Sequence, residues 1–312
     1  MTEEFKHIPV LLKEVIDGLS IKKDGIYVDC TIGGGGHSSE ILKKLSDKGH
    51  LYGFDRDADA IEECQNKFKD DQKVSLIHAN YKEATYLLKE KGVDKIDGFL
   101  IDLGVSSYQI DTASRGFSFL HDGKIDMRMD QSQKLDGYEV VNNYSRDRLL
   151  KILYNYGEES NARKIVDNIL KHRQIKPITT TIELKSIIEE CFSKKIIYGK
   201  GGVSKKTFQA IRIEVNGELD GLDNALKNLV DLLKSGGRGV VLTFHSLEDR
   251  IVKNVFKELS TGCICPPKTP VCICGHKQSI RLINKKPITA SEEETRINSR
   301  STSAKLRIIE KI

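Results

Sequence analysis

The chain has 312 residues, of which 38% are hydrophobic and 30% are charged. This length allows one large domain or two modest ones, each with a buried core. No apolar run is long enough to cross a bilayer, and the polar start Met1–Lys6 does not resemble a secretory leader. We therefore expect a cytoplasmic protein without a membrane segment, whose seven cysteines are reduced thiols or metal ligands.

The formal net charge is +5, and it is unevenly distributed. Residues 276–312 carry nine Lys/Arg against four Glu, a surplus as large as that of the whole chain. Such a surplus indicates a polyanionic partner. A solvated basic tail explains it nearly as well.

The first hundred residues alternate between apolar β-rich runs and amphipathic helical stretches. We predict helices at 7–20, 38–46, 57–68 and 82–91, and strands at 25–30, 50–55, 74–78 and 97–103. This alternation predicts an α/β fold with a parallel sheet and helices on both faces. Right-handed crossovers place the loops that follow the strands at one edge, where ligands bind.

A glycine-rich turn joins the first strand to the next helix. Asp29 ends the strand, the run Gly33-Gly34-Gly35-Gly36 follows, and His37 begins the helix. This geometry brings backbone N–H groups and a helix N-terminus to a ligand. Asp55, at the end of the second strand, is placed to accept hydrogen bonds from a ribose diol. We favour a nucleoside cofactor over a tight turn with a capping aspartate.

The glycine spacing differs from the G-x-G-x-x-G pattern that seats a pyrophosphate. Asp29 would repel a pyrophosphate but could attract the ammonium of an amino-acid moiety. S-adenosylmethionine carries that ammonium and no phosphate, so we predict a methyl donor. Tyr81, just after the third strand, either stacks on the adenine or caps the core.

The fourth strand ends in Asp102, followed by a glycine turn and Ser106. Hydrogen-bond acceptors here could draw an exocyclic amine towards a geometry that faces the sulfonium, while alignment does most of the work. The alternative for Asp102 is a cofactor contact or a helix cap.

A stacked base would have to be turned out into the pocket at the end of the fourth strand. Phe117 and Phe119 either line its wall or belong to the core of the next domain.

Residues 110–206 contain no convincing strand, and we predict helices at 146–156, 158–173 and 181–192. We interpret this segment as a helical substrate-recognition domain, inserted into a discontinuous domain formed by 1–109 and 207–312. Its basic end includes Lys205 and Lys206, and is either a loop that grips phosphates or a solvated hinge.

The last third returns to the α/β pattern. We predict one long helix from Thr207 to Lys234, a strand at 238–243, a helix at 247–259 capped by Ser246 and Asp249, and a β pair near 279–284 and 304–310.

A cluster of cysteines lies between the last helix and the β pair. It comprises Cys263, Cys265, Cys272 and Cys274. Four thiols within twelve residues suit a tetrahedral structural zinc site. The C-x-C spacing is tighter than the usual C-x-x-C, so a proline-stiffened loop with reduced thiols remains an alternative.

Several long motifs occur together in one order along the chain. They are His7-x-Pro-Val-Leu-Leu, Asp29-x-Thr-x-Gly-Gly-Gly-Gly-His-Ser, Asp55-Arg-Asp, Asp102-Leu-Gly-Val-Ser-Ser, Arg115-Gly-Phe-Ser-Phe, Asp126-Met-Arg-Met-Asp, Tyr156-Gly-Glu-Glu, Phe208-Gln-Ala-x-Arg-Ile-x-Val-Asn and Phe244-His-Ser-Leu-Glu-Asp-Arg. From His7 to the last strand the chain resembles the MraW/RsmH family of bacterial S-adenosylmethionine-dependent methyltransferases. Members of that family methylate N4 of a cytosine in the decoding region of 16S rRNA.

The resemblance implies a class I (Rossmann-like) methyltransferase sheet with an inserted helical domain. It implies that the enzyme acts on 16S rRNA within an assembled or nearly assembled small ribosomal subunit. The cofactor contacts that we assign are Gly33, Gly34, Gly35, Gly36, His37, Asp55, Tyr81, Asp102 and Gln109. The candidate substrate contacts are Arg115, Phe117, Phe119, Lys205, Lys206, His245 and Arg300.

The chain departs from the family pattern at a few positions. Tyr108 replaces a usual proline, Ser114 replaces a usual acid, the loop 202–206 lacks a His-Pro pair, and 298–303 retains only Arg300 of two arginines. Two other functions remain open. One is methylation of protein, DNA or a small molecule, and the other is ribosome assembly without catalysis.

Overall fold

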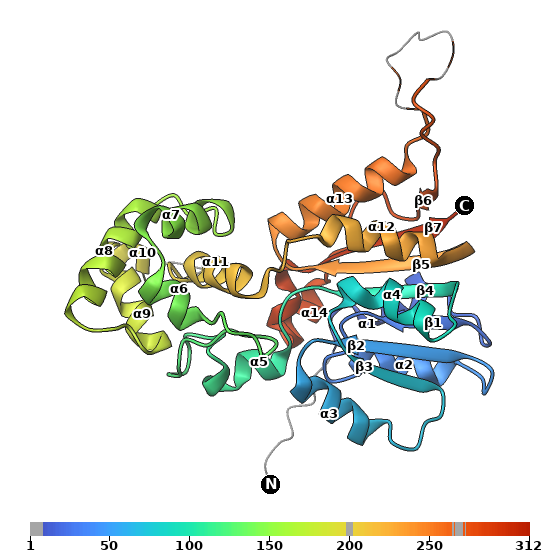
Figure 1. The fold of residues 1–312 in the computed structure, drawn as a ribbon, viewed down its shortest axis with the longest axis horizontal. Coiled ribbons are helices and arrows are strands. Elements are labelled where there is room, and N and C mark those ends of the chain that lie inside the picture. The colour runs from blue at the N-terminus through green and yellow to red at the C-terminus, as the bar shows by residue number, and fades with distance from the viewer. Residues whose placement is uncertain (1–8, 198–201, 264, 266–270, 272) are drawn as a thin grey trace. The chain divides into compact units, whose positions relative to one another are not determined.

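The computed structural model describes residues 9–197, 202–263, 265, 271 and 273–312. The chain divides into two compact units (Figure 1). The sheet unit comprises 1–104 and 221–312, and the helical unit comprises 105–220. The helical unit therefore extends beyond the expected 110–206 at both ends. No helix in the described part of the chain is long and apolar enough to cross a membrane.

The sheet unit is built on seven strands. They are β1 (Ile26–Asp29), β2 (His50–Asp55), β3 (Val74–His78), β4 (Ile96–Asp102), β5 (Leu233–Thr243), β6 (Ile280–Leu282) and β7 (Lys305–Lys311). Their order is β3-β2-β1-β4-β5-β7-β6, and only the pairs that include β7 are antiparallel. This order confirms the predicted α/β fold with a mainly parallel sheet. The strand order reverses between β1 and β4, where a doubly wound sheet binds its ligand.

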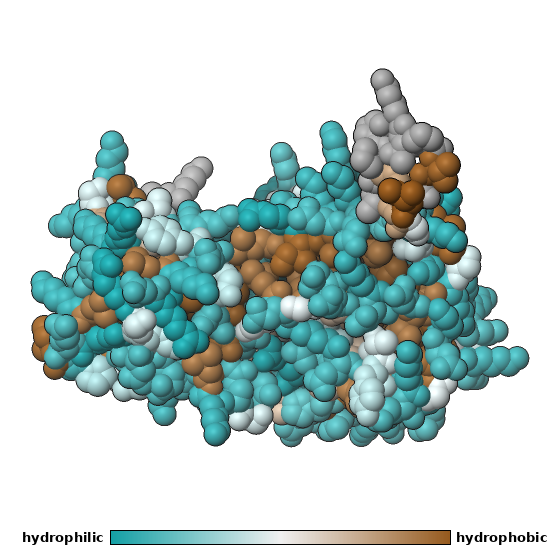
Figure 2. Space-filling view, turned by 45° about the horizontal axis from the view of Figure 1, so that its top comes forward, coloured by the Kyte–Doolittle hydropathy of each residue, from teal (hydrophilic) through white to brown (hydrophobic). Residues whose placement is uncertain are grey.

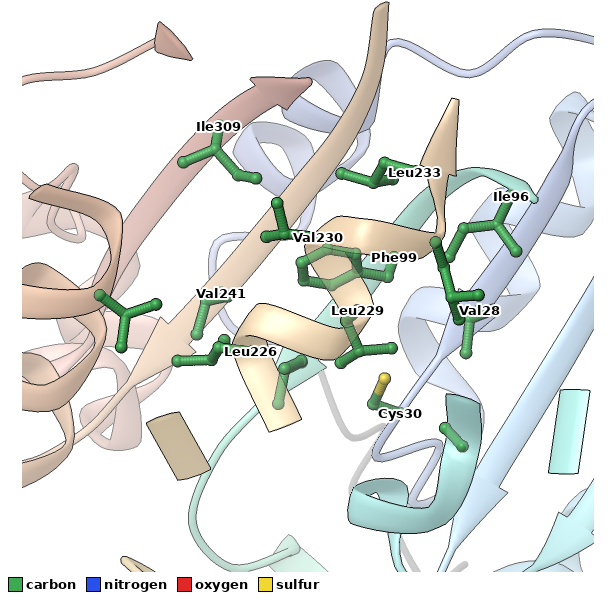
Figure 3. Close-up of a cluster of buried hydrophobic side chains, with 14 of the residues drawn as sticks. Val28, Cys30, Ile96, Phe99, Leu226, Leu229, Val230, Leu233, Val241 and Ile309 are labelled. Carbon is green, nitrogen blue, oxygen red and sulfur yellow. The ribbon is translucent and has the colours of Figure 1, made fainter. Parts of the chain in front are cut away.

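Alternating residues of the strands enter two apolar layers. Phe99 and Ile101 of β4 pack with α4 (Ala84–Glu90), α12 (Leu222–Leu232) and α13 (Ser246–Ser260), as Figure 3 shows in part. Leu100 packs on the other face with α1 (Leu12–Leu19) and α2 (Gly36–Lys44). Helix α3 (Ala58–Lys67) contributes Ile61 and Cys64 to a smaller cluster. Burial on both faces explains why these strands are nearly continuous apolar runs.

The predicted long helix from Thr207 to Lys234 is wrong. The structure has α11 (Lys205–Asn216) and α12, separated by Gly217 and Gly221 at φ of +54° and +66°. Glycine adopts this left-handed conformation at little cost, so the helix ends there. Strand β5 also begins at Leu233, earlier than the predicted 238, with a register shift opposite Ile96–Gly98.

The helical unit has its own apolar core. Its elements are α5 (Ser107–Asp111), α6 (Gly137–Asn143), α7 (Arg146–Asn155), α8 (Ala162–Ile175), α9 (Thr181–Glu189), α10 (Lys194–Ile197) and α11. The buried Asn216 side chain ties α11 to the loop before α6, since it donates to Met127 O and accepts from Met129 N. The structure confirms a helix at each of three predicted places, 146–156, 158–173 and 181–192. Helix α8 begins four residues later than expected.

Candidate cofactor site

Three carboxylates end three adjacent strands of the sheet. Asp29 closes β1, Asp55 closes β2 and Asp102 closes β4, and β1 pairs in parallel with both neighbours. The carboxyl ends of parallel strands share one edge, so the sequence was right to place these acids together. Among the described residues, no lysine or arginine forms an ion pair with any of the three.

Two hydrogen bonds fix the Asp29 carboxylate next to the glycine turn. Its side chain is buried, Ser38 Oγ donates to Oδ2 at 2.7 Å, and Thr31 N donates to Oδ1 at 3.2 Å. Burial raises the pKa of Asp29 to about 6, although these two hydrogen bonds act in the opposite direction and the Asp55 charge adds to the rise. Asp29 therefore organises the turn as well as contributing negative charge.

Asp55 organises the same turn from the neighbouring strand. Gly33 N donates to Oδ2 and Asp57 N donates to Oδ1, both at 2.9 Å. Burial raises the pKa of the Asp55 carboxyl, and these backbone donors partly offset that rise. A carboxylate oxygen can accept more than one hydrogen bond, so Asp55 keeps the capacity to accept from a diol.

The glycine run is required by its surroundings. Gly35 is the N-cap of α2 at φ +68°, and a Cβ there would lie 2.8 Å from the Phe68 ring. A Cβ on Gly36 would overlap Pro9. Side chains at these positions would therefore strain the turn or push its walls apart.

His37 connects the start of α2 to Asp102. Its Nε2 lies 3.0 Å from Val10 O, and a carbonyl can only accept, so Nε2 carries the hydrogen. The Nδ1 atom lies 3.7 Å from Asp102 Oδ2. The buried His37 ring thus has its second nitrogen beside the acid at the end of β4.

Asp102 is the most electrostatically perturbed acid at this edge. Its backbone N–H donates to Thr31 Oγ1 at 2.7 Å, while its buried Oδ1 accepts no hydrogen bond from the described residues. Burial raises the pKa of Asp102 to about 8, and repulsion from Asp29 and Glu248 contributes. A buried acceptor without a donor in the protein fits a site that takes a cation or an N–H group from a ligand.

Tyr81 and His245 extend this edge. Tyr81 begins a 3-10 turn after β3 and is half-buried against the core. This position agrees with core capping, and adenine stacking stays a prediction.

His245 follows β5 and caps α13. The predicted cap by Ser246 and Asp249 is wrong, because His245 Nδ1 accepts from Glu248 N, while Glu248 Oε2 accepts from His245 N. Asp249 instead pairs with Arg307.

The sequence did not reveal how the turn before α1 supports this site. Leu11 adopts φ +51°, and its N–H donates to Glu294 Oε1 at 2.7 Å from α14 (Glu292–Ile297). The same turn supplies Val10 O to His37 and places Pro9 against Gly36. The 283-residue separation of Leu11 and Glu294 hides this contact from any local pattern.

Glu294→Ala is expected to weaken binding of S-adenosylmethionine by roughly tenfold, which corresponds to about 1.4 kcal/mol. The substitution removes the acceptor that holds Leu11 in a left-handed conformation, so the Val10 carbonyl and His37 lose their fixed position. Calorimetric titration measures the change in affinity. Glu292→Ala, an exposed residue of the same helix, is the control. Equal affinities for both variants would contradict this role.

Two predicted site residues belong to the helical unit and cap α5. Ser106 Oγ accepts from Gln109 N at 3.2 Å, and Gln109 Oε1 accepts from Ser106 N at 3.0 Å. This reciprocal pair is a capping box. The structure therefore gives both side chains a local role, while amine polarisation by Ser106 and cofactor contact by Gln109 remain predictions.

The candidate substrate contacts of the helical unit differ in exposure. Arg115 is buried and donates to the carbonyls of Arg128 and Met129. Phe117 and Phe119 pack against the unit's core, as the core alternative predicted. Lys205 and Lys206 are exposed at the start of α11. In the sheet unit, Arg300 lies partly exposed in a 3-10 turn.

Curated relatives and solved structures resemble this chain over most of its length. Ribosomal RNA small subunit methyltransferase H of Clostridium botulinum strain 657 is 54% identical over 309 residues, covering 99% of this chain and 100% of that protein. The Finegoldia magna protein of the same name is 49% identical, covering 99% of each chain. A solved rRNA methylase from Streptococcus thermophilus has a TM-score of 0.40 at 13% identity, covering 96% of this chain and 92% of that one.

The model of the MraW methylase family matches residues 4–312. This match spans the carboxylate edge, the helical unit and the last strand of the sheet. The chain belongs to the MraW methylase family.

Proposed function

We propose that this protein transfers a methyl group from S-adenosylmethionine to N4 of a cytosine in the decoding region of 16S rRNA. The single observation that carries the proposal is the strand edge formed by Asp29, Asp55 and Asp102. It is acidic, it has no ion-pairing lysine or arginine among the described residues, and Asp102 Oδ1 is a buried acceptor without a donor there. Such an edge suits a phosphate-free, cationic nucleoside.

S-adenosylmethionine is the methyl donor of this family, and when bound it supplies a methyl carbon made electrophilic by its sulfonium. We assign the ribose hydroxyls to Asp55, since its carboxylate already shapes the turn that would surround them. Asp29 and the backbone of Gly33–Gly36 form the floor of the site. We assign the adenine to Tyr81, whose aromatic side chain follows β3.

The chain's own task in the reaction is to hold an exocyclic amine in line with the methyl carbon. The nitrogen would form the new N–C bond as the S–C bond breaks, which leaves S-adenosylhomocysteine, and the nitrogen would then lose a proton to water. Asp102 is the first candidate to accept a hydrogen bond from that amine, and Ser106, four residues later, is the second. An ionised acceptor would localise the amine's lone pair, and alignment would supply most of the rate enhancement.

Recognition of RNA is assigned to charges outside the acidic edge. Lys205 and Lys206 are exposed, and residues 276–312 carry a surplus of five positive charges. Exposed cations such as Lys205 bind phosphates without reading sequence. Part of the surplus in 276–312 is instead held in ion pairs, such as that of buried Arg307 with Asp249. We propose that the helical unit and this basic segment contact rRNA in an assembled or nearly assembled small subunit. The name of the relatives gives small-subunit rRNA as their substrate.

The test offers radiolabelled S-adenosylmethionine with small subunits, naked 16S rRNA, DNA and bulk protein in parallel. We expect label in the small subunit, and digestion to nucleosides followed by mass spectrometry should identify N4-methylcytidine. Asp102→Ala is expected to abolish the label. Label confined to protein or DNA would refute the substrate. Tight subunit binding without any label would instead favour an assembly factor.

A further inference from the structure

A long excursion leaves the sheet unit between α13 and β6 (Figure 1). Its two arms are joined at the base, where Ser279 N donates to Leu259 O at 2.9 Å and His276 Nε2 lies 3.0 Å from Glu258 O. Beyond this base the described side chains lack an apolar core, since Val271 and Ile273 are 72% and 83% exposed. Figure 2 shows hydrophobic surface beside the grey atoms of this excursion. An excursion without a core needs another source of order.

Three thiols from both arms converge in it. The Sγ atoms of Cys263, Cys265 and Cys274 all lie within 4.8 Å of one another. The Cys263 and Cys274 sulfurs are 3.8 Å apart, so they are not joined by a disulfide. A tetrahedral ion with metal–sulfur bonds of about 2.3 Å requires sulfur–sulfur edges of about 3.8 Å. The observed separation is the one that a shared ion would impose.

Backbone donors also point at these sulfurs. Cys265 N donates to Cys263 Sγ, and Ile273 N donates to Cys265 Sγ, both at 3.4 Å. Hydrogen bonds from N–H groups stabilise a thiolate, the form that binds metal. Gly275 follows Cys274 at φ +64°, a left-handed turn conformation that glycine adopts at little cost. Donors, spacing and turn together form a prepared thiolate site.

We propose that Cys263, Cys265 and Cys274 bind one thiolate-preferring metal ion, with zinc as the ion expected in a cell. Cys272, the fourth cysteine of the sequence prediction, lies outside the described residues. Helix α13 separates this cluster from His245, and its 15 residues span about 22 Å. The ion is therefore structural. It joins the two arms of the excursion and takes no part in methyl transfer.

The test uses the full chain, purified under reducing conditions with and without added zinc. We expect one zinc per chain by inductively coupled plasma mass spectrometry. The metal-free chain should bind cobalt(II) with a thiolate-to-cobalt charge-transfer band. Cys263→Ser and Cys274→Ser should each lose the band and weaken zinc binding by roughly a hundredfold or more. Cys191→Ser, a buried cysteine of the helical unit, should bind as wild type.

Two results would overturn the proposal. One is a reduced, folded chain that gives no cobalt–thiolate band. The other is zinc binding that survives both Cys263→Ser and Cys274→Ser. Circular dichroism confirms that the variants remain folded. Binding of S-adenosylmethionine, measured on the same samples, should be unchanged, so failure of the metal site and failure of the methyltransferase proposal are distinguished.

Discussion

Asp55→Ala is expected to weaken S-adenosylmethionine binding by roughly a hundredfold or more while the chain stays folded. Each hydrogen bond to a charged group contributes about 1.5–3 kcal/mol, and the ribose diol would lose its acceptor. The substitution also releases Gly33 N and Asp57 N, so the glycine turn loses part of its support. Isothermal titration calorimetry measures the affinity, and circular dichroism reports the fold.

Two further variants separate the causes of that loss. Asp55→Asn keeps one acceptor oxygen for the turn but removes the charge, so it should lose less affinity than Asp55→Ala. Asp70→Ala removes an exposed carboxylate of the same unit and should bind as wild type. An unchanged dissociation constant for Asp55→Ala would refute the ribose assignment, because the side chain would then serve only the turn.

The sheet was predictable because its strands are buried on both faces. Runs such as Phe99–Ile101 are apolar without interruption and end in an acid, a pattern that local inspection detects. Each acid ends a strand of a parallel sheet. The three acids are therefore expected at the same edge of that sheet. The common edge of Asp29, Asp55 and Asp102 therefore followed from local sequence and one topological rule.

The elements that were mispredicted depend on individual turns. The helix predicted to reach Lys234 fails there because Lys234, Gly236 and Gly237 lie inside β5, where the register shifts. His245 was overlooked as a cap because serine at 246 is a commoner capping residue. The contact between Leu11 and Glu294 depends on tertiary packing, so neither residue carried a local signal.

Electrostatics also could not be deduced from the sequence. A carboxylate at a strand end is ordinary, and only the structure shows that Asp102 has a buried oxygen without a donor among the described residues. Its neighbours Asp29 and Glu248 arrive from different segments of the chain. If Asp102 contacts the cofactor as we propose, this shift in its pKa makes cofactor binding depend on pH.

S-adenosylmethionine binding is expected to tighten as the pH rises from 6 to 8, by roughly tenfold per pH unit below the pKa of Asp102. That pKa is about 8 in the protein, above its ordinary value of 3.8. Asp102 is therefore largely protonated at pH 6, and a cationic ligand favours the ionised form. Binding should release a proton, which calorimetry in buffers of different ionisation enthalpy detects.

The folding stability of the ligand-free protein depends on pH with the opposite sign to cofactor binding. A carboxyl whose pKa rises on folding stabilises the chain at low pH, and this contribution is lost as the pH rises through the folded pKa. The ligand-free protein should therefore lose thermal stability as the pH rises from about 4 to about 8, with the Asp29 contribution lost by about pH 6 and the Asp102 contribution lost by about pH 8. Asp102→Asn should remove most of the proton release and flatten both profiles, whereas Asp70→Ala should leave them unchanged. Proton release that persists in Asp102→Asn would assign the linkage to another acid at this edge, with Asp29 the next to test.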